Sequence, residues 1–199
     1  MKQILLSFLV FFISSHSYTQ SNQLGKEIIP FSMQVVNGPN ISISDWSNYQ
    51  GIALVFVCNH CPMAKLYWKR MQEMFERNQG RKILVVAVNP MDSLLYEEET
   101  RTKMQLKVKK EKITLPYVQD GDQSISQSFE IPHTPHCIFL WKDNKHWFVR
   151  YEGAFDNNGL HPDEAEPYLQ NAINQLYSGE NPTLPVTESF GCRVFYRKE

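Results

Sequence analysis

Two apolar runs dominate the middle of the chain, and a helical pattern separates them. The runs at 51–57 and 82–88 are almost wholly apolar, which is typical of central strands covered on both faces. Between them, residues 62–79 carry apolar side chains at spacings of three and four, which predicts a helix ending at Gly80. A strand, a helix and a second strand in this order predict a parallel pair joined by a right-handed crossover.

The second half of the chain continues this alternation. Residues 97–112 are charged, with acids first and lysines last, and they predict a helix with a mostly solvated surface. Two strands at 137–141 and 147–151 flank the turn residues 142–145, and residues 163–177 predict a last helix. The pattern therefore predicts an α/β fold with a central mixed sheet flanked by helices.

The segments outside this unit are shorter. Residues 28–36 and the alternating Ile41 and Ile43 flank a turn at 37–40, which predicts an N-terminal β-hairpin extension. Residues 180–199 are interrupted by prolines, and we expect them to form a C-terminal tail.

The first twenty residues have the layout of a secretory signal peptide. Lys2 precedes an apolar run at 4–13, and small polar residues follow at 14–17. This run is shorter than the ~20 residues of a spanning helix, although a membrane anchor or a buried helix is the alternative. No cysteine follows the run, so we expect no lipid attachment. Residues 1–20 thus predict a periplasmic or otherwise exported protein, without stable membrane insertion after cleavage.

Composition narrows the class of protein. The chain has 199 residues, 42 % of them hydrophobic, and a formal net charge of −1. These values predict one folded domain, at 21–179, and argue against disorder and nucleic-acid binding. Four cysteines are too few for a disulfide scaffold of this length, but disulfides persist outside the cytoplasm.

A Cys-x-x-Cys motif lies where the first apolar strand meets the following helix. A helix N-terminus favours the thiolate form, which is the attacking species in disulfide exchange. We therefore expect a lowered pKa at Cys58 and assign Cys58 as nucleophile and Cys61 as resolving cysteine. His60 either stabilises the thiolate or points to solvent. The alternatives for the pair are a static disulfide and half of a zinc site.

Thr134 and Pro135 precede a strand and form a second candidate element. A cis Pro135 would expose the Thr134 backbone to an extended substrate, although the residues alone favour the commoner trans bond. Cys137 is interpreted as a buried small residue. Cys192 has two open roles: it is a second resolving thiol that the tail places over the active site, or it pairs with Cys137. We favour a Cys58–Cys61 disulfide.

Several short motifs resemble a known family. The chain is similar to thioredoxin-like, peroxiredoxin-related proteins of the alkyl hydroperoxide reductase/thiol-specific antioxidant (AhpC/TSA, redoxin) family. The resemblance implies a thioredoxin fold, a cis Pro135 and a redox-active Cys58. The matching segments are Phe56-Val57-Cys58-Asn59-His60-Cys61-Pro62, Val86-Ala87-Val88-Asn89, His133-Thr134-Pro135-His136, residues 151–158, and Gly191-Cys192 with Val194 and Tyr196.

The chain also departs from related patterns. Typical peroxiredoxins place a proline and a hydroxyl residue before the reactive cysteine, where this sequence has Gly51 and Val55. This difference favours disulfide exchange over peroxide reduction. Thioredoxins often carry a buried acid near the strand, whereas Ile52 and its neighbours are apolar, so the sequence shows no internal proton acceptor.

The leading hypothesis is an exported thiol-disulfide oxidoreductase that cycles Cys58 and Cys61. Its expected partners are protein thiols or disulfides and a redox partner that supplies or takes electrons, with no cofactor and no metal. The alternatives are an antioxidant thiol peroxidase and a copper or zinc carrier that uses Cys58, Cys61, His60 and His136.

Overall fold

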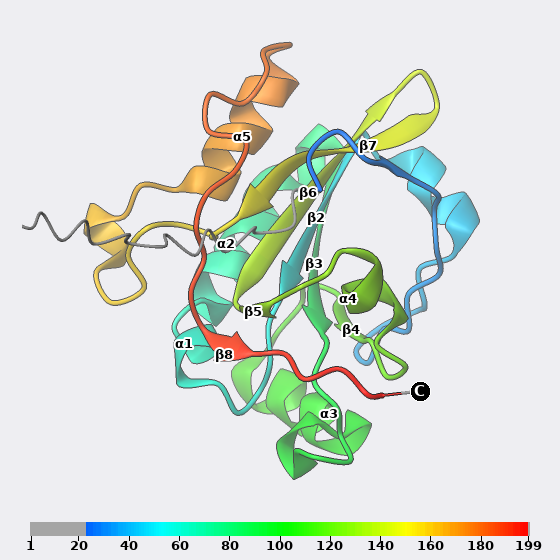
Figure 1. Cartoon of the computed structure of the whole chain (residues 1–199), viewed down its shortest axis with the longest axis vertical. Helices are drawn as coiled ribbons and strands as arrows, with labels where there is room; N and C mark the ends of the chain where they lie inside the picture. The colour runs from blue at the N-terminus through cyan, green and yellow to red at the C-terminus, as the bar shows by residue number, and fades with distance from the viewer. Residues whose placement is uncertain (1–22, 199) are drawn as a thin grey trace, which may run out of the picture.

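A six-stranded mixed sheet forms the centre of the computed structural model, which describes residues 23–198 (Figure 1). Its strand order is β1-β7-β6-β2-β3-β4. Strands β2, β3 and β4 run parallel, while β6 pairs antiparallel with β2, β7 with β6 and β1 with β7. The strands are β1 Glu27–Ile28, β2 Gly51–Phe56, β3 Ile83–Asn89, β4 Tyr117–Gln119, β6 His136–Asp143 and β7 His146–Gly153.

The two central strands are buried along their whole length. Every residue of β2 and β3 is buried, as the apolar runs predict. Strand β2 lies between β3 and β6, so both of its edges are hydrogen-bonded and both of its faces are covered. The predicted mixed sheet of a thioredoxin fold is therefore confirmed, and Cys58 lies just after the C-terminal end of the central strand β2.

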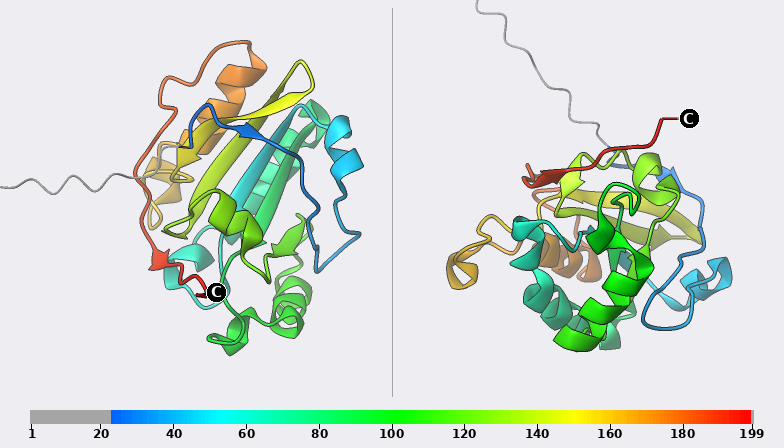
Figure 2. Two further views of the ribbon diagram at one scale, coloured as in Figure 1. Left: turned by 45° about the vertical axis from the view of Figure 1, so that its right-hand side comes forward. Right: turned by 90° about the horizontal axis from the view of Figure 1, so that it is seen from below.

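Helices cover the two faces of this sheet (Figure 2). Helix α2 packs on β3, and α5 packs on β6 and β7 on the same face, while α4 lies on the opposite face. The α-helices are α1 Pro62–Lys65, α2 Trp68–Asn78, α3 Arg101–Glu111, α4 Ser124–Ser128 and α5 Tyr168–Tyr177. Short 3₁₀ turns are η1 Ile43–Asn48, η2 Gln79–Arg81, η3 Glu97–Glu99 and η4 Pro162–Glu164.

The helix predicted at 62–79 is broken in two, at Leu66 and Tyr67. The backbone nitrogens of both residues bond to carbonyls three positions earlier, which tightens this turn. The ring of Tyr67 packs edge-on against Phe155, and its hydroxyl donates a hydrogen bond to Asp156. This packing accounts for the break, which a pattern of local spacings does not reveal.

Two other helices are shorter than the sequence predicts. Glu97–Glu99 forms its own 3₁₀ turn, and α3 starts only at Arg101. The expectation of a mostly solvated surface holds for α3, where Met104 alone is buried, but is wrong for Glu99, whose side chain is fully buried. The last helix begins at Tyr168 because Pro167 disfavours helical geometry in the residue before it.

The predicted N-terminal hairpin consists of a single bridge. Met33 and Ile41 exchange backbone hydrogen bonds across the turn, but Ile43 already begins η1 and so does not extend a strand. The Asp45 carboxylate, which accepts a bond from the Ser42 nitrogen, caps this 3₁₀ turn. Val35 also bridges Val118, so the segment covers the open edge of β4.

The tail runs across the molecule to the end of the sheet where Cys58 lies. Val186 pairs with Glu152 near the end of β7, and β8 (Cys192–Arg193) pairs antiparallel with β5 (His133–Thr134). Figure 1 shows β8 in red near α1 and β5. Among the described residues, no helix is long and apolar enough to cross a bilayer. The predicted signal peptide lies outside these residues.

Candidate active site

Cys58 and Cys61 lie between the end of β2 and the start of α1. Cys61 is the N-cap of α1 and Pro62 is its first residue, a position where proline is well tolerated. Both cysteines are fully buried. The strand-to-helix placement predicted for the motif is therefore confirmed.

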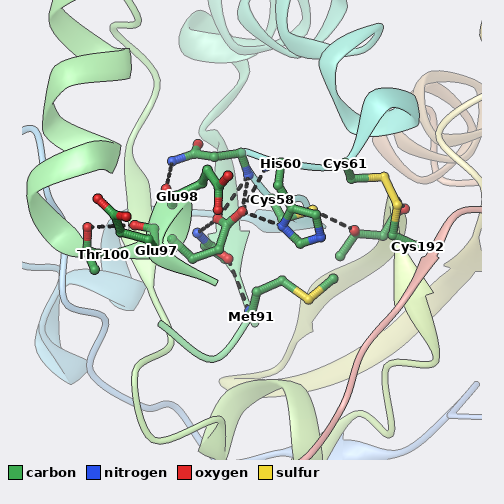
Figure 3. A network of polar contacts seen from close by, with 12 residues as sticks. Cys58, His60, Cys61, Met91, Glu97, Glu98, Thr100 and Cys192 are labelled. Carbon is green, nitrogen blue, oxygen red and sulfur yellow. Dashed lines mark hydrogen bonds and ion pairs between the residues drawn. A yellow bond between two sulfur atoms is a disulfide. The ribbon is translucent and has the colours of Figure 1, made fainter. Parts of the chain in front are cut away.

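The disulfide of this structure joins Cys61 to Cys192. The two Cα atoms are 6.0 Å apart, and 131 positions separate the residues in the sequence. Cys58 is a free, buried thiol (Figure 3). The favoured Cys58–Cys61 pairing is therefore not the one present. The pairing of β8 with β5 explains the difference, because it places Cys192 opposite Thr134, whose carbonyl oxygen is 3.5 Å from the Cys61 sulfur.

Thr134 and Pro135 face the two cysteines. The peptide bond between them is cis, as the resemblance implies and contrary to the trans bond favoured by the residues alone. The hydroxyl oxygen of Thr134 is 3.1 Å from the sulfur of Cys58. Thr134 thus contacts Cys58 through its side chain and lies beside Cys61 through its backbone.

A buried carboxylate holds the loop between the cysteines. Glu99 accepts hydrogen bonds from the backbone nitrogens of Asn59, at 2.9 and 3.0 Å, and of His60, at 2.8 Å. It also accepts a bond of 2.6 Å from the amide of Asn89 at the end of β3. The expectation of no internal acid is therefore wrong: the acid comes from the turn after β3 instead of from β2.

His60 points toward this carboxylate, and its side chain is 23 % exposed. Its Nδ1 lies 2.7 Å from Glu99, and its ring stacks on Tyr96 with centroids 4.3 Å apart. One donor atom from each of Cys58, His60 and Glu99 lies within 4.8 Å of the other two. Figure 3 shows His60 beside Cys58. Of the two predicted orientations, the structure has the one near the thiol.

Asn59 is held by a second set of contacts. Its side-chain oxygen accepts a bond of 3.0 Å from the hydroxyl of Tyr117, and its amide donates to the carbonyl of Glu98 at 2.7 Å. Asn89 in turn donates to the Tyr117 hydroxyl at 3.2 Å. Each residue of the Asn59-His60 pair is therefore fixed through both its backbone and its side chain.

Cys58 is a protonated thiol in this closed structure, in which the Cys61–Cys192 disulfide joins the tail to the site. Burial raises the pKa of Cys58 to about 11, opposed by the nearby Thr134 hydroxyl and reinforced by the negative charge of Glu99. The predicted lowering of this pKa is therefore wrong for this state. Because α1 has only four residues, its terminus offers little positive potential against the burial.

The histidines beside Pro135 belong to a separate contact. Rings of His133 and His136 lie 3.0 and 2.6 Å from the hydroxyl of Ser189 in the tail. Burial, reinforced by His133, lowers the pKa of His136 to about 3, so its ring is neutral. His136 therefore binds the tail and does not join Cys58 and His60, so the predicted metal set is not assembled as proposed.

Cys137 lies inside the sheet. It pairs with Val55 across β6 and β2 and is fully buried. Burial raises its pKa well above the ordinary value, and negative charge at Asp156 adds to this effect. Its interpretation as a small core residue agrees with this position, and its pairing with Cys192 is excluded here by the Cys61–Cys192 bond.

Sequence reasoning missed two parts of the site. Glu99 belongs to a run of three glutamates, and the run itself reads as solvent-exposed. Ser189 carried no motif at all. Asn89, the last residue of one matching segment, has a clear structural role because its amide donates a hydrogen bond to Glu99.

Comparisons with known proteins agree with this fold. The chain resembles a hypothetical protein from Sinorhizobium meliloti 1021, with a TM-score of 0.79 and 21 % identity, over 90 % of this chain and 97 % of that one. An uncharacterized conserved protein from Geobacillus kaustophilus gives 0.77 and 22 %, over 88 % and 93 %. A thiol-disulfide isomerase from Corynebacterium glutamicum gives 0.53 and 14 %, over 64 % and 84 %. At these identities the likeness shows the fold.

Sequence comparison identifies the family. Among curated protein sequences, none matches the chain. The AhpC/TSA family model matches residues 24–154, from the start of the described structure to the end of β7. This match covers more than half of the chain and includes Cys58, Cys61, Glu99 and Pro135. The chain therefore belongs to the AhpC/TSA family and has its thioredoxin-like fold.

Proposed function

We propose that this protein is an exported thiol-disulfide oxidoreductase that acts on protein thiols or disulfides through Cys58 and Cys61. The observation that carries the proposal is one arrangement: a free Cys58 and a disulfide-bonded Cys61 at a strand-to-helix junction, both facing the cis Thr134–Pro135 bond. Thiol and disulfide are both present within a single site, as exchange chemistry requires.

The first chemical step needs the Cys58 thiolate. Glu99 and His60 are ionisable groups within 4.8 Å of the Cys58 sulfur, and a proton can pass to either of them, directly or through one water molecule. The Thr134 hydroxyl then donates a hydrogen bond to the sulfur anion. The thiolate attacks a substrate disulfide, and a mixed disulfide forms while one substrate thiolate leaves.

The second step returns the site to an internal disulfide. Cys61 is three residues after Cys58 in the sequence. Its thiolate attacks the Cys58 sulfur and releases the second substrate thiol. The substrate has accepted two electrons, and the protein now holds the disulfide. A partner dithiol must later reduce it.

A groove beside Pro135 can accept the substrate chain. It has a volume of about 310 Å³ and lies between α1 and the tail. Its walls include Met63, Tyr67, Phe155 and Phe190 together with Asp156 and Glu188, so it can hold a substrate side chain that has both apolar and polar parts.

Turnover with insulin tests this function. Reduced wild-type protein should reduce the insulin disulfides, and Cys58→Ser should lower the rate to that of the buffer, because the attacking sulfur is gone. Cys137→Ser is the matched control, because this buried cysteine lies inside the sheet, and it should keep the wild-type rate. Full activity in Cys58→Ser would contradict the proposal.

Peroxide consumption provides a separate test of the alternative. Position 55 in β2 holds a fully buried valine, so β2 offers no hydroxyl there to orient a peroxide. In stopped-flow measurements, we expect the reduced protein to consume hydrogen peroxide no faster than free cysteine does. A rate far above that of free cysteine would favour the peroxidase.

A further inference from the structure

The tail occupies the open side of β5, where an extended substrate would bind. In this structure β8 pairs antiparallel with β5, and Cys192 lies opposite Thr134, the residue before the cis proline. Cys192 is also joined to a site cysteine. The tail therefore makes both contacts expected of a bound disulfide substrate: backbone pairing with Thr134 and a bond to a reactive sulfur.

Contacts on both sides of Cys192 hold the tail in place without the disulfide. Before it, the Thr187 hydroxyl lies 2.6 Å from Tyr151, and Ser189 contacts His133 and His136. The chain passes so close to Gly153 that a Cβ there would lie 2.1 Å from the Thr187 carbonyl oxygen.

After Cys192, the tail contacts the residues that precede β5 and the loop that follows β3. Val194 is buried and donates a backbone bond to Pro132. Tyr196 donates to the carbonyls of Ser126 and Ile131 at 3.0 and 2.7 Å, and Arg197 pairs with Asp92. Cys192 is thus positioned by the fold on both sides.

Gly191 marks the closest approach. A Cβ at this position would lie 1.8 Å from the Thr134 carbonyl oxygen, so only glycine lets the tail reach this depth. A larger residue at this position would hold the tail away from Thr134. Glycine therefore allows Cys192 to reach Cys61.

Exposure separates the three site cysteines. Cys58 and Cys61 are fully buried, whereas Cys192 is only partly buried. In the closed structure an external thiol therefore meets Cys192 first. Cys58 is shielded and protonated at neutral pH, because burial raises its pKa to about 11.

We propose that Cys192 is the terminal resolving thiol of this protein and the point where its reductant attacks. The inference rests on the proposed function. After substrate reduction leaves a Cys58–Cys61 disulfide, the Cys192 thiolate attacks the Cys61 sulfur. The Cys61–Cys192 bond forms, the Cys58–Cys61 bond breaks, and Cys58 leaves as a thiolate that takes up a proton.

Resetting the site uses a dithiol of a partner protein. One partner thiolate attacks Cys192, forms a mixed disulfide with it and releases Cys61. The second partner thiol attacks the first, so the partner leaves as a disulfide and Cys192 as a thiol. Substrate and reductant thus use different cysteines, Cys58 and Cys192.

A quenched time course tests the order of these bonds. Fully reduced protein is mixed with insulin, trapped with acid and alkylating agent, and mapped by mass spectrometry. Cys58–Cys61 should appear first and then convert to Cys61–Cys192. If Cys58–Cys61 is the end product and Cys192 stays alkylatable, the proposal is wrong.

Three variants distinguish the proposal from a structural disulfide. Cys192→Ser should keep the first turnover with insulin but stop at Cys58–Cys61. Gly191→Ala should slow the conversion at least about tenfold, because the new Cβ collides with Thr134. Gly121→Ala, where a Cβ meets nothing within 4 Å, is its control and should convert at the wild-type rate.

Cys58→Ser separates failure of this inference from failure of the proposed function. If insulin still oxidises Cys61 and Cys192 at the wild-type rate in this variant, the bond forms without Cys58 and the relay is wrong. If wild-type protein reduces insulin but never forms Cys61–Cys192, the proposed function stands and this inference alone fails.

Discussion

The carboxylate of Glu99 is a single side chain that holds two backbone nitrogens of the reactive loop. This buried carboxylate accepts hydrogen bonds from the backbone nitrogens of Asn59 and His60 and from the side-chain amide of Asn89. It also contacts the ring of His60. Because it also raises the pKa of Cys58, it has two opposing effects: it fixes the loop and disfavours the thiolate. Its exposed neighbour Glu98 has neither effect through its side chain.

Removing this carboxylate should weaken the fold. A buried polar group without a partner costs about 1–3 kcal/mol, so Glu99→Ala should lower the free energy of unfolding by about 2–4 kcal/mol. Glu98→Ala is the control, since that side chain is exposed and the carbonyl that accepts from Asn59 is retained. Equal unfolding midpoints for the two variants in urea would show that Glu99 does not hold the loop.

At the scale of elements, apolar patterns predicted the sheet well and the site less well. Strands β2 and β3 could be predicted because each is a continuous buried run. The break at Tyr67 and the inward turn of Glu99 depend on partners far along the chain, Phe155 and Asn59, which local spacing does not encode.

The tail is the element whose role was least predictable. Its two-residue strand β8 gives almost no local signal, and its position depends on pairing with the equally short β5. Cys192 was therefore an open candidate in the sequence, and the register Thr134↔Cys192 decides its partner. The quenched time course examines the disulfide that this register allows Cys192 to form.

At the scale of the whole molecule, a buried neutral histidine links stability to pH. His136 begins β6 and contacts Ser189 of the tail, and its pKa is lowered from 6.5 to about 3. Between these values the unfolded chain binds a proton that the folded chain does not. Stability contributed by the neutral ring is therefore complete above pH 6.5 and is lost as the pH falls.

The expected loss is about 2 kcal/mol between pH 6.5 and pH 5, from about 1.4 kcal/mol for each pH unit. Urea unfolding at several pH values measures it, and His133, whose pKa is also lowered, adds to the loss in the same direction. His136→Gln should reduce the dependence to the part that His133 contributes, whereas His161→Gln, in an exposed loop, should leave it unchanged. A wild-type stability that is constant over this range would contradict the assignment.

The most direct test of the central claim is to trap the bond between Cys58 and a substrate. The double variant Cys61→Ser, Cys192→Ser lacks both resolving thiols, so a mixed disulfide with insulin should accumulate and resist further exchange. Peptide mapping by mass spectrometry should place the insulin chain on Cys58, with Cys137 unmodified. If no adduct forms, or if it forms on Cys137, Cys58 is not the attacking thiol of this protein.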